Sequence, residues 1–267
     1  MPRLDIELLS RNIATSRERA KELIKGGYIT VNGKVASKPA LTVCETDEIS
    51  SSAEEFKYVG RGGLKIERAV SEFELNLKNK ICVDIGASTG GFTDCMLQNG
   101  AKYVYAVDVG HSQLDEKLRS DERVYNAENT DIRDVDNDFF KYEIDFISID
   151  VSFISVTKVL PKAYEILKEG AEVSALIKPQ FEAGKAFIGK KGIVKDKKTH
   201  MRILSEICGF VRSIGFNPIK LVCSGIKGGS GNIEYLLYLR KEAPVYIEFD
   251  YRTIVEQAFS SLDERKL

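Results

Sequence analysis

Four charged residues stand beside aliphatic runs of the sequence. Asp150 and Lys178 each follow directly on such a run, and Glu234 lies one residue inside another. Lys65 belongs to a segment whose apolar spacing predicts a helix. A lysine that is neutral for part of the time can take the proton of a hydroxyl group, and burial or a second positive charge lowers the pKa of a lysine enough to allow this. The same four residues could instead form a buried ion-pair cluster without a chemical role.

A glycine turn is the first element that could bring such residues together. In residues 81–92 an aliphatic run gives way to closely spaced glycines and then to an amphipathic segment, which predicts a strand, a tight turn and the start of a helix. Glycine lets the backbone approach a ligand closely, and a helix N-terminus offers free N–H groups. A nucleotide-like ligand is therefore expected here. The expected contacts are Gly86, Ser88, Gly90, Gly91 and Phe92.

Two carboxylates indicate which nucleotide would bind. Asp84 lies two residues before the first glycine, and Asp108 ends the next aliphatic run, 103–107. A carboxylate at the end of the second strand can accept hydrogen bonds from ribose hydroxyls. A carboxylate beside the glycine turn would repel a pyrophosphate but attract an amino group, which favours S-adenosylmethionine over NAD. The alternative is a plain structural turn between a strand and a helix.

A further polar position follows the predicted strand 123–126. Asp131 and Ile132 place a carboxylate next to an aliphatic side chain. This pair suits an adenine, with the Asp131 carboxylate for the exocyclic amine and Ile132 for the face of the ring. A polar surface loop is the alternative.

The composition bounds the class of protein. The 267 residues are 43% hydrophobic and 30% charged, so the chain can hold one large domain or two unequal ones. No apolar run approaches the ~20 residues of a membrane helix, and no apolar signal-peptide core follows Arg3. Five scattered cysteines and two histidines predict neither disulfides nor a metal site. We therefore expect a cytoplasmic protein without a metal ion and without membrane contact.

Strand and helix patterns alternate through most of the chain. This alternation indicates an α/β protein with a largely parallel sheet and helices on both faces. The last strand follows a short glycine-rich segment that leaves no room for a crossover helix, so it is expected to pair antiparallel with the strand before it. Strands are predicted at 81–85, 103–107, 123–126, 144–149, 172–177, 218–223 and 233–239, and helices at 91–98, 112–119, 157–168 and 199–214.

The N-terminal region has a different pattern and is basic. Residues 1–40 contain eight Lys and Arg against four Asp and Glu, a net charge of +4. Helices are predicted at 3–11 and after a capping box at 15–18, and the hairpin predicted at 28–35 contains the Asn-Gly pair of a type I′ turn. Such a basic face suits a polyanion partner, although it could be an ordinary solvated face. The second helix carries cations at every fourth residue, namely Arg17, Lys21 and Lys25.

This basic region resembles the S-four type RNA-binding domain. The matching residues are Arg3-Leu-Asp5, Ser16-Arg17, Ala20, Leu23-Ile24, Gly27, Ile29, Val31-Asn32-Gly33, Lys38-Pro39 and Asp47. The resemblance implies docking on folded RNA, with Arg17 and Lys21 on phosphates and Arg3 and Lys25 nearby. The expected division is an RNA-binding domain at 1–55, a linker at 56–63 and a second domain at 64–267.

The second domain resembles the TlyA family of FtsJ-like methyltransferases. The resemblance implies a Rossmann-like class I methyltransferase fold, with a mostly parallel seven-stranded sheet whose last strand is antiparallel, joined to a small α+β N-terminal domain. The charged residues at 65, 150, 178 and 234 match the Lys-Asp-Lys-Glu tetrad of ribose 2′-O-methyltransferases. The matching motifs are Arg61-Gly-Gly-Leu-Lys65, Gly86-Ala-Ser-Thr-Gly-Gly-Phe-Thr93, Asp150-Val-Ser-Phe-Ile-Ser155, Lys178-Pro-Gln-Phe-Glu182 and Gly192-Ile-Val-Lys-Asp196.

The resemblance also implies a reaction. A methyl group would pass from S-adenosylmethionine to the 2′-oxygen of a cytidine in ribosomal RNA, with 23S rRNA of the large subunit as the expected target and 16S rRNA as a second. Lys178 would be the base, Asp150 and Glu234 would orient it, and Lys65 would tune it or hold the substrate ribose. Positioning of the hydroxyl by Lys178, without proton transfer, stays open. The expected partners are ribosomal RNA or ribosomal subunits, and a monomer is favoured.

The segment 181–198 is rich in glycine and lysine and is expected to be a mobile loop that faces RNA, with a solvated surface loop as the alternative.

Other functions remain open: a non-catalytic RNA assembly factor, a haemolysin-like toxin and an NAD-dependent oxidoreductase. The chain has no tryptophan, so a signalling role for a linker tryptophan is not carried over. Further expected RNA contacts are Arg61, Lys185, Lys190 and Lys191.

Overall fold

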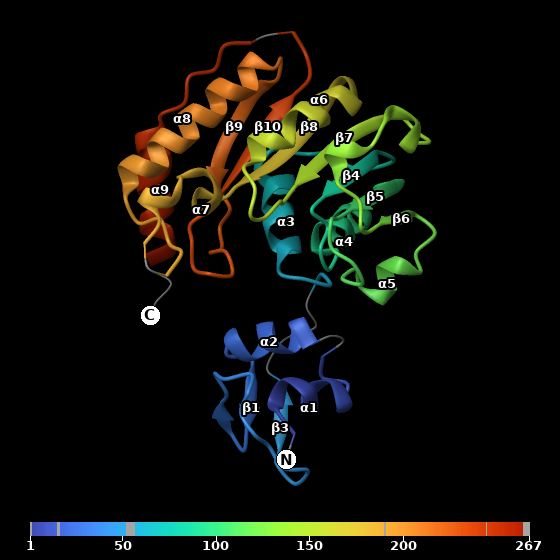
Figure 1. Cartoon of the computed structure of the whole chain (residues 1–267), viewed down its shortest axis with the longest axis vertical. Helices are drawn as coiled ribbons and strands as arrows, with labels where there is room; N and C mark the ends of the chain where they lie inside the picture. Colours follow the sequence, from blue (N-terminus) through green and yellow to red (C-terminus); the bar gives the residue numbers. More distant parts are fainter. Residues whose placement is uncertain (1, 15–16, 52–56, 190, 244, 264–267) are drawn as a thin grey trace. The chain divides into compact units, whose positions relative to one another are not determined.

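The computed structural model of the protein describes residues 2–14, 17–51, 57–189, 191–243 and 245–263 (Figure 1). The chain divides into two compact units, residues 1–60 and residues 61–267. Within the described residues, no helix combines the length and the apolar character needed to cross a bilayer.

The first unit combines two helices with a small antiparallel sheet. The helices are α1 (Leu4–Ser10) and α2 (Arg17–Lys25). The strands are β1 (Ile29–Val31), β2 (Lys34–Val35) and β3 (Ile49–Ser51), in the order β2-β1-β3. This arrangement confirms the expected small α+β domain.

The predicted hairpin is present between β1 and β2. Asn32 (φ 50°) and Gly33 (φ 73°) adopt the left-handed conformations of a type I′ turn, which sets the register Val31 to Lys34. The capping box expected at Thr15 and Ser16 lies outside the described residues. Apolar side chains from both helices and from β1 form the core of this unit, among them Leu4, Leu8, Leu23, Ile24 and Ile29.

The second unit is built on a seven-stranded sheet with the order β6-β5-β4-β7-β8-β10-β9. The five strands from β6 to β8 run parallel, and β10 runs antiparallel to both of its neighbours. The mostly parallel sheet and the antiparallel last strand confirm the predicted fold. The strands are β4 (Ile81–Ile85), β5 (Tyr103–Val107), β6 (Val124–Ala127), β7 (Ile144–Ile149), β8 (Leu167–Ile177), β9 (Asn217–Cys223) and β10 (Tyr235–Arg240).

Helices cover both faces of this sheet, as the strand alternation predicts (Figure 1). Leu237 and Leu239 of β10 belong to the core that α6, α8 and α9 form on one face. Phe73, directly after α3, stacks on Tyr238 from the other face with ring centroids 5.1 Å apart. The helices are α3 (Gly62–Glu72), α4 (Gly91–Gln98), α5 (Glu116–Arg119), α6 (Leu160–Ile166), α7 (Pro179–Glu182), α8 (Lys197–Ser213) and α9 (Tyr251–Asp263).

Several predicted boundaries were wrong for local reasons. The helix expected at 112–119 begins only at Glu116, because Ser112 has φ 52° and Asp115 caps the helix by accepting a hydrogen bond from the Lys117 amide. The helix expected at 157–168 starts as a 3-10 turn, since Pro161 can occupy only the first turn of α6. It ends early, at the point where β8 begins.

Other differences concern whole elements. Helix α9 was not predicted at all. Helix α3 begins at Gly62, inside the stretch expected to be a linker, and Glu234 precedes β10 instead of lying within it. Glycine in the first turn of α3 was misinterpreted as loop sequence, because glycine is unfavourable in helix interiors.

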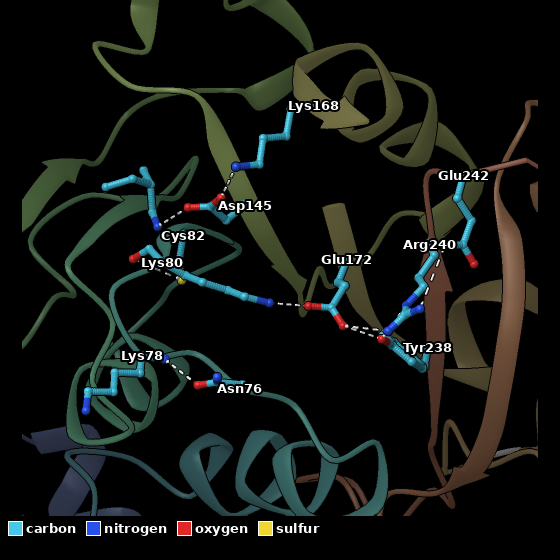
Figure 2. A network of polar contacts seen from close by, with 11 residues as sticks. Asn76, Lys78, Lys80, Cys82, Asp145, Lys168, Glu172, Tyr238, Arg240 and Glu242 are labelled. Carbon is cyan, nitrogen blue, oxygen red and sulfur yellow. Dashed lines mark hydrogen bonds and ion pairs between the residues drawn. The ribbon is translucent and has the colours of Figure 1, made fainter. Parts of the chain in front are cut away.

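A polar network joins four strand regions at the sheet edge where the parallel strands begin (Figure 2). Glu172 of β8 accepts hydrogen bonds from Lys80, which precedes β4, and from Tyr238 of β10, and it lies 3.6 Å from the Arg240 guanidinium. Asp145 of β7 accepts a hydrogen bond from the Ile81 amide at 2.7 Å. These contacts link β8 and β10 near the end of the sheet where the parallel strands begin. Asp150 and Lys178 lie at the opposite end of the sheet, where the parallel strands β7 and β8 finish.

Candidate active site

The structure brings Lys65, Asp150, Lys178 and Glu234 together in one chain of ion pairs. Lys178 Nζ lies 2.5 Å from Asp150 Oδ1. Lys65 Nζ lies 4.0 Å from the other oxygen of that carboxylate and 2.7 Å from Glu234 Oε2. The order in space is thus Lys178, Asp150, Lys65, Glu234, with charges that alternate in sign.

The sheet topology explains why residues so far apart in sequence meet. Strands β7 and β8 are parallel neighbours, so Asp150 and Lys178, which directly follow them, emerge at the same edge. Strand β10 runs the other way, so its preceding residue, Glu234, returns to that edge. Lys65 reaches the cluster from α3, which packs on β10. The cluster lies beyond the carboxyl ends of the parallel strands, where ligands bind in open α/β sheets.

Burial makes this cluster electrostatically strong. Lys65, Lys178 and Glu234 are each less than a tenth exposed. Burial lowers the pKa of Lys65, but the carboxylates of Asp150 and Glu234 raise it by more, so the net shift is upward. Lys65 is therefore a fixed positive charge beside the other three groups.

Several contacts of the cluster were not found by sequence reasoning. Ser152 Oγ accepts a hydrogen bond from Lys178 Nζ at 2.8 Å, and Gln180 Nε2 donates one to Glu234 Oε1 at 3.2 Å. At Gly228 a Cβ atom would lie 2.2 Å from Glu234 Oε1, so the absence of a side chain there leaves room for the carboxylate. Ser152 and Gln180 lie two residues after Asp150 and Lys178, inside motifs quoted above. This closeness in sequence to the charged residues is the signal that could have identified them.

Hydrogen bonds also join the segments that follow Asp150 and Lys178. Glu182, at the end of α7, accepts hydrogen bonds from the Ser155 hydroxyl at 2.5 Å and from the Val156 amide at 2.8 Å. Burial raises the pKa of this carboxyl, although both hydrogen bonds act in the opposite direction. The contact holds α7 against the loop after β7.

A cavity of about 690 Å³ adjoins the cluster at Asp150. At Gly86, where φ is +86°, a Cβ atom would lie 2.6 Å from the Asp150 carbonyl oxygen. The glycine turn therefore runs against the backbone of the loop after β7 because no side chain intervenes. The lining includes five of the residues predicted for a nucleotide ligand: Gly86, Ser88, Asp108, Asp131 and Ile132.

The two lining carboxylates have defined partners. Asp108 accepts hydrogen bonds from the Ser88 amide at 2.8 Å and the Gly110 amide at 2.7 Å. Asp131 pairs with Arg133, whose Nη2 lies 2.5 Å from Oδ2, and this guanidinium holds the pKa of the Asp131 carboxyl below its usual range. The Asp131 carboxylate therefore already has a charged partner. Its expected contact with the exocyclic amine of an adenine stays a prediction.

Other predicted contacts lie behind the cavity wall. Asp84 is fully buried and accepts hydrogen bonds from Thr93 Oγ1 at 2.7 Å and Ser148 Oγ at 3.0 Å. This placement differs from the expected direct contact with a ligand amino group, because both carboxylate oxygens are held inside the unit. Gly90 and Gly91 begin α4, and Phe92 packs near Gly62, where a Cβ would lie 3.2 Å from its ring. These residues shape the turn from behind.

Comparison with known proteins assigns the chain to a family. Residues 58–241 match the family model of FtsJ-like methyltransferases, and residues 2–49 match that of the S4 domain. The TlyA 16S/23S rRNA (cytidine-2′-O)-methyltransferase of Mycobacterium tuberculosis is 37% identical over 90% of this chain and 90% of its own. The chain belongs to the TlyA family of FtsJ-like methyltransferases.

Two further similarities extend over almost the whole chain. The Bacillus subtilis protein YqxC, described as an rRNA methyltransferase, is 44% identical over 99% of this chain and 96% of its own. A solved structure from Streptococcus thermophilus, described as a hemolysin, is 41% identical, covers 99% of this chain and 98% of its own, and superposes with a TM-score of 0.82. The family similarity therefore covers both units.

Membership of a methyltransferase family implies use of S-adenosylmethionine, and the cavity residues of this TlyA-family chain fit that group. The volume is in the range of small-molecule sites, the glycine turn offers backbone rather than side chains, and the Asp108 carboxylate ends β5 where ribose hydroxyls are bound in such folds. Within the described part of the chain, no three His, Cys, Asp or Glu side chains are grouped as metal ligands are.

The predicted RNA-binding cations are placed differently in the two units. In the S4 unit, Arg3 and Arg17 are about half exposed and pair with the buried Asp5 at 2.9 and 3.2 Å. The Arg3 guanidinium, with Arg17, lowers the pKa of Asp5 to about 2. Lys21 and Lys25 follow on α2. In the methyltransferase unit Arg61 precedes α3, Lys185 and Lys191 are exposed, and Lys190 lies outside the described residues.

The segment expected to be a mobile loop is anchored in its second half. Val194 is buried, its amide donates to Asn232 Oδ1 at 3.0 Å, and its carbonyl contacts His200 Nε2 at 3.0 Å. A carbonyl can only accept, so Nε2 carries the proton and Nδ1 accepts from the Tyr235 hydroxyl, 2.9 Å away. This part of 181–198 is thus tied to the start of β10, next to Glu234.

Asp84 leads to a prediction about pH. Burial raises the pKa of this carboxyl from 3.8 to about 7, so the folded state holds a proton that the unfolded state releases above about pH 4. The stability that the neutral form contributes is complete below pH 4 and is lost as the pH rises to 7, by up to about 1.4 kcal/mol per pH unit. Asp84→Asn should lack this loss, so its stability relative to the natural chain should rise by on the order of 2 kcal/mol between pH 5 and pH 7.

Urea unfolding at the two pH values measures this difference. The exposed Asp136→Asn is the matched control and should show no such change. A difference between the natural chain and Asp84→Asn that stays constant with pH would show that Asp84 does not titrate in this range.

Proposed function

We propose that this protein methylates the ribose 2′-hydroxyl of a cytidine in ribosomal RNA, in 23S rRNA and also in 16S rRNA, with S-adenosylmethionine as methyl donor. The observation that carries the proposal is the chain of ion pairs from Lys178 to Glu234 at the end of a nucleotide-sized cavity. The name of the M. tuberculosis relative supports the choice of substrate.

The chemistry required of the residues is modest. S-adenosylmethionine, when bound, supplies a methyl group that is already activated on a sulfonium centre. A ribose hydroxyl is a weak nucleophile, so it must lose its proton as its oxygen attacks. Lys178 would take that proton or hold the hydroxyl in line, and Asp150 would orient Lys178.

Lys65 and Glu234 would act on Lys178 indirectly. The positive charge of Lys65 lies 4.0 Å from Asp150 and therefore shares the carboxylate that pairs with Lys178. Glu234 holds Lys65 in place at 2.7 Å.

The remaining predicted residues would bind the two substrates. Gly86 and Ser88 would place backbone against the cofactor, Asp108 would accept hydrogen bonds from its ribose, and Asp131 and Ile132 would contact its adenine. Cations of the RNA-binding domain, which we place at 1–55, would contact phosphates and set the register on RNA without reading its sequence. The proposed phosphate contacts are Arg3, Arg17, Lys21, Lys25, Arg61, Lys185, Lys190 and Lys191.

Phe153 is the best candidate for holding the target base. Its side chain is 92% exposed, its φ of 65° is rare for an aromatic residue, and it lines the cavity next to Ser152. Phe181 lies alongside, with ring centroids 5.2 Å apart. An exposed ring in a strained conformation beside the reacting group suits stacking on an unpaired base.

Replacement of Phe153 by alanine should therefore lower kcat/KM for ribosomal RNA by about 10- to 100-fold, the range expected for loss of one base stack. Steady-state kinetics on ribosomal subunits measures the loss. Phe153→Tyr keeps the ring and should stay near the natural rate. An alanine variant with unchanged kcat/KM would rule out the stack.

The experiment that tests the function is transfer of labelled methyl from S-adenosylmethionine to unmodified 30S subunits, 50S subunits and 70S ribosomes. The proposal predicts label in ribosomal RNA of the 50S subunit and of the 30S subunit. Asp108→Ala is the control and should weaken cofactor binding. Tight cofactor binding with no label on any particle would contradict the proposal and favour a non-catalytic RNA-binding role.

A further inference from the structure

We propose that Ser152 is a positioning residue, whose hydroxyl fixes the direction in which Lys178 presents its lone pair to the substrate. This rests on the proposed function, because it concerns the step in which Lys178 receives a proton. Ser152 lies in the motif that begins at Asp150, and the role proposed for it comes from geometry.

The argument begins with the partners of Lys178 Nζ. Ser152 Oγ accepts a hydrogen bond from this nitrogen at 2.8 Å, and Asp150 Oδ1 lies 2.5 Å from it as the partner in an ion pair. Among the described residues, no third hydrogen-bond acceptor contacts it, and the Phe181 ring centroid is 5.9 Å away. The side chain of Lys178 is 10% exposed.

A neutral amine has two N–H bonds and one lone pair. Ser152 accepts one N–H bond, and the adjacent Asp150 carboxylate would repel the lone pair, so the lone pair is expected to take the remaining direction. Asp150 and Ser152 line the cavity, so the nitrogen that both contact lies beside the space where the substrates would meet. Without the Ser152 oxygen the amine can turn about its last bond, and the lone pair is no longer held in one direction.

The exposure of Ser152 separates this role from a structural one. Ser152 is exposed, and among the described residues its hydroxyl is hydrogen-bonded to the side chain of Lys178 alone. Removal of an exposed hydroxyl should not disturb packing, so an effect on the rate would report on Lys178.

The test compares Ser152→Ala and Ser152→Thr with the natural chain. The single-turnover rate of methyl transfer is measured on the substrate subunit, with saturating S-adenosylmethionine, across the pH range. We expect the plateau rate of the alanine variant to fall by about 3- to 30-fold. Threonine keeps the hydroxyl and should stay within about threefold of the natural rate. Cofactor and RNA affinities should be unchanged in both.

The pH profile provides the second readout. The charged groups around Lys178 are Asp150, Lys65 and Glu234, and neither substitution changes them. Loss of the Ser152 acceptor removes a hydrogen bond that favours the charged amine, so the acid limb of the alanine profile should move to lower pH although its plateau falls. A residue that acts only through packing would lower the plateau without moving the limb.

Each outcome decides the proposal. An alanine variant with the natural plateau and limb, or a threonine variant as slow as the alanine variant with an unmoved limb, would overturn it. If the natural chain methylates no particle, the proposed function fails first. The reaction of Lys178 with an amine reagent, followed by mass spectrometry, still tests the hydrogen bond in that case, since the alanine variant should react at lower pH.

Discussion

Replacement of Lys178 by alanine is expected to slow methyl transfer by about 10³-fold, the middle of the range for loss of a general base. Binding of S-adenosylmethionine should be nearly unchanged, because Lys178 is not among the residues that line the cavity. Single-turnover kinetics measures the first effect, and calorimetric titration of the cofactor measures the second.

A second substitution decides between the two roles left open for Lys178. Lys178→Arg keeps a positive donor at this position, but an arginine does not give up its proton in proteins. If Lys178 is the base, the arginine variant should be as slow as alanine; if it only positions the hydroxyl, arginine should recover part of the rate. Lys102→Ala, at an exposed lysine of the same unit with no proposed role, is the control. An alanine variant at position 178 that keeps more than a tenth of the natural rate would contradict both roles.

The second large effect is on stability. Glu234→Gln would leave the charge of the buried Lys65 without its closest counter-ion, 2.7 Å away. Breaking a buried pair by removing one partner costs about 3–5 kcal/mol, and Asp150 at 4.0 Å should offset part of this. We expect the free energy of unfolding to fall by about 3 kcal/mol, measured by urea denaturation.

The double variant Lys65→Met with Glu234→Gln is the matched control. It removes both charges but keeps an amide that Gln180 can still contact, so stability should return most of the way to that of the natural chain. Methyl transfer should be lost in the double variant even so, because the positive charge of Lys65 beside Asp150 is gone. A Glu234→Gln variant as stable as the natural chain would show that Lys65 does not depend on this carboxylate.

The parts of the fold that the sequence predicted follow from local patterns. The aliphatic runs located the seven strands, and the short segment before Tyr235 required an antiparallel return. The Asn32-Gly33 pair specified its turn. Because the strands are parallel and end at one edge, the meeting of Asp150 and Lys178 followed from topology alone.

The parts that were missed depend on packing between distant segments. The insertion of β10 between β8 and β9 is set by which strand pairs with which, and no local pattern encodes that choice. The burial of Asp84 depends on Thr93 and Ser148, which face it from other elements. The hydrogen bond of Ser152 to Lys178 depends on how the loops after β7 and β8 are held together, which the sequence does not state.

The most direct test of the central claim is the chemical position of the transferred methyl group. Ribosomal RNA methylated with labelled S-adenosylmethionine is digested to nucleosides and separated by chromatography with mass detection. The account predicts that the label elutes as 2′-O-methylcytidine with the natural chain and is absent with Lys178→Ala. Label on a base, or on the ribose of another nucleoside, would contradict it.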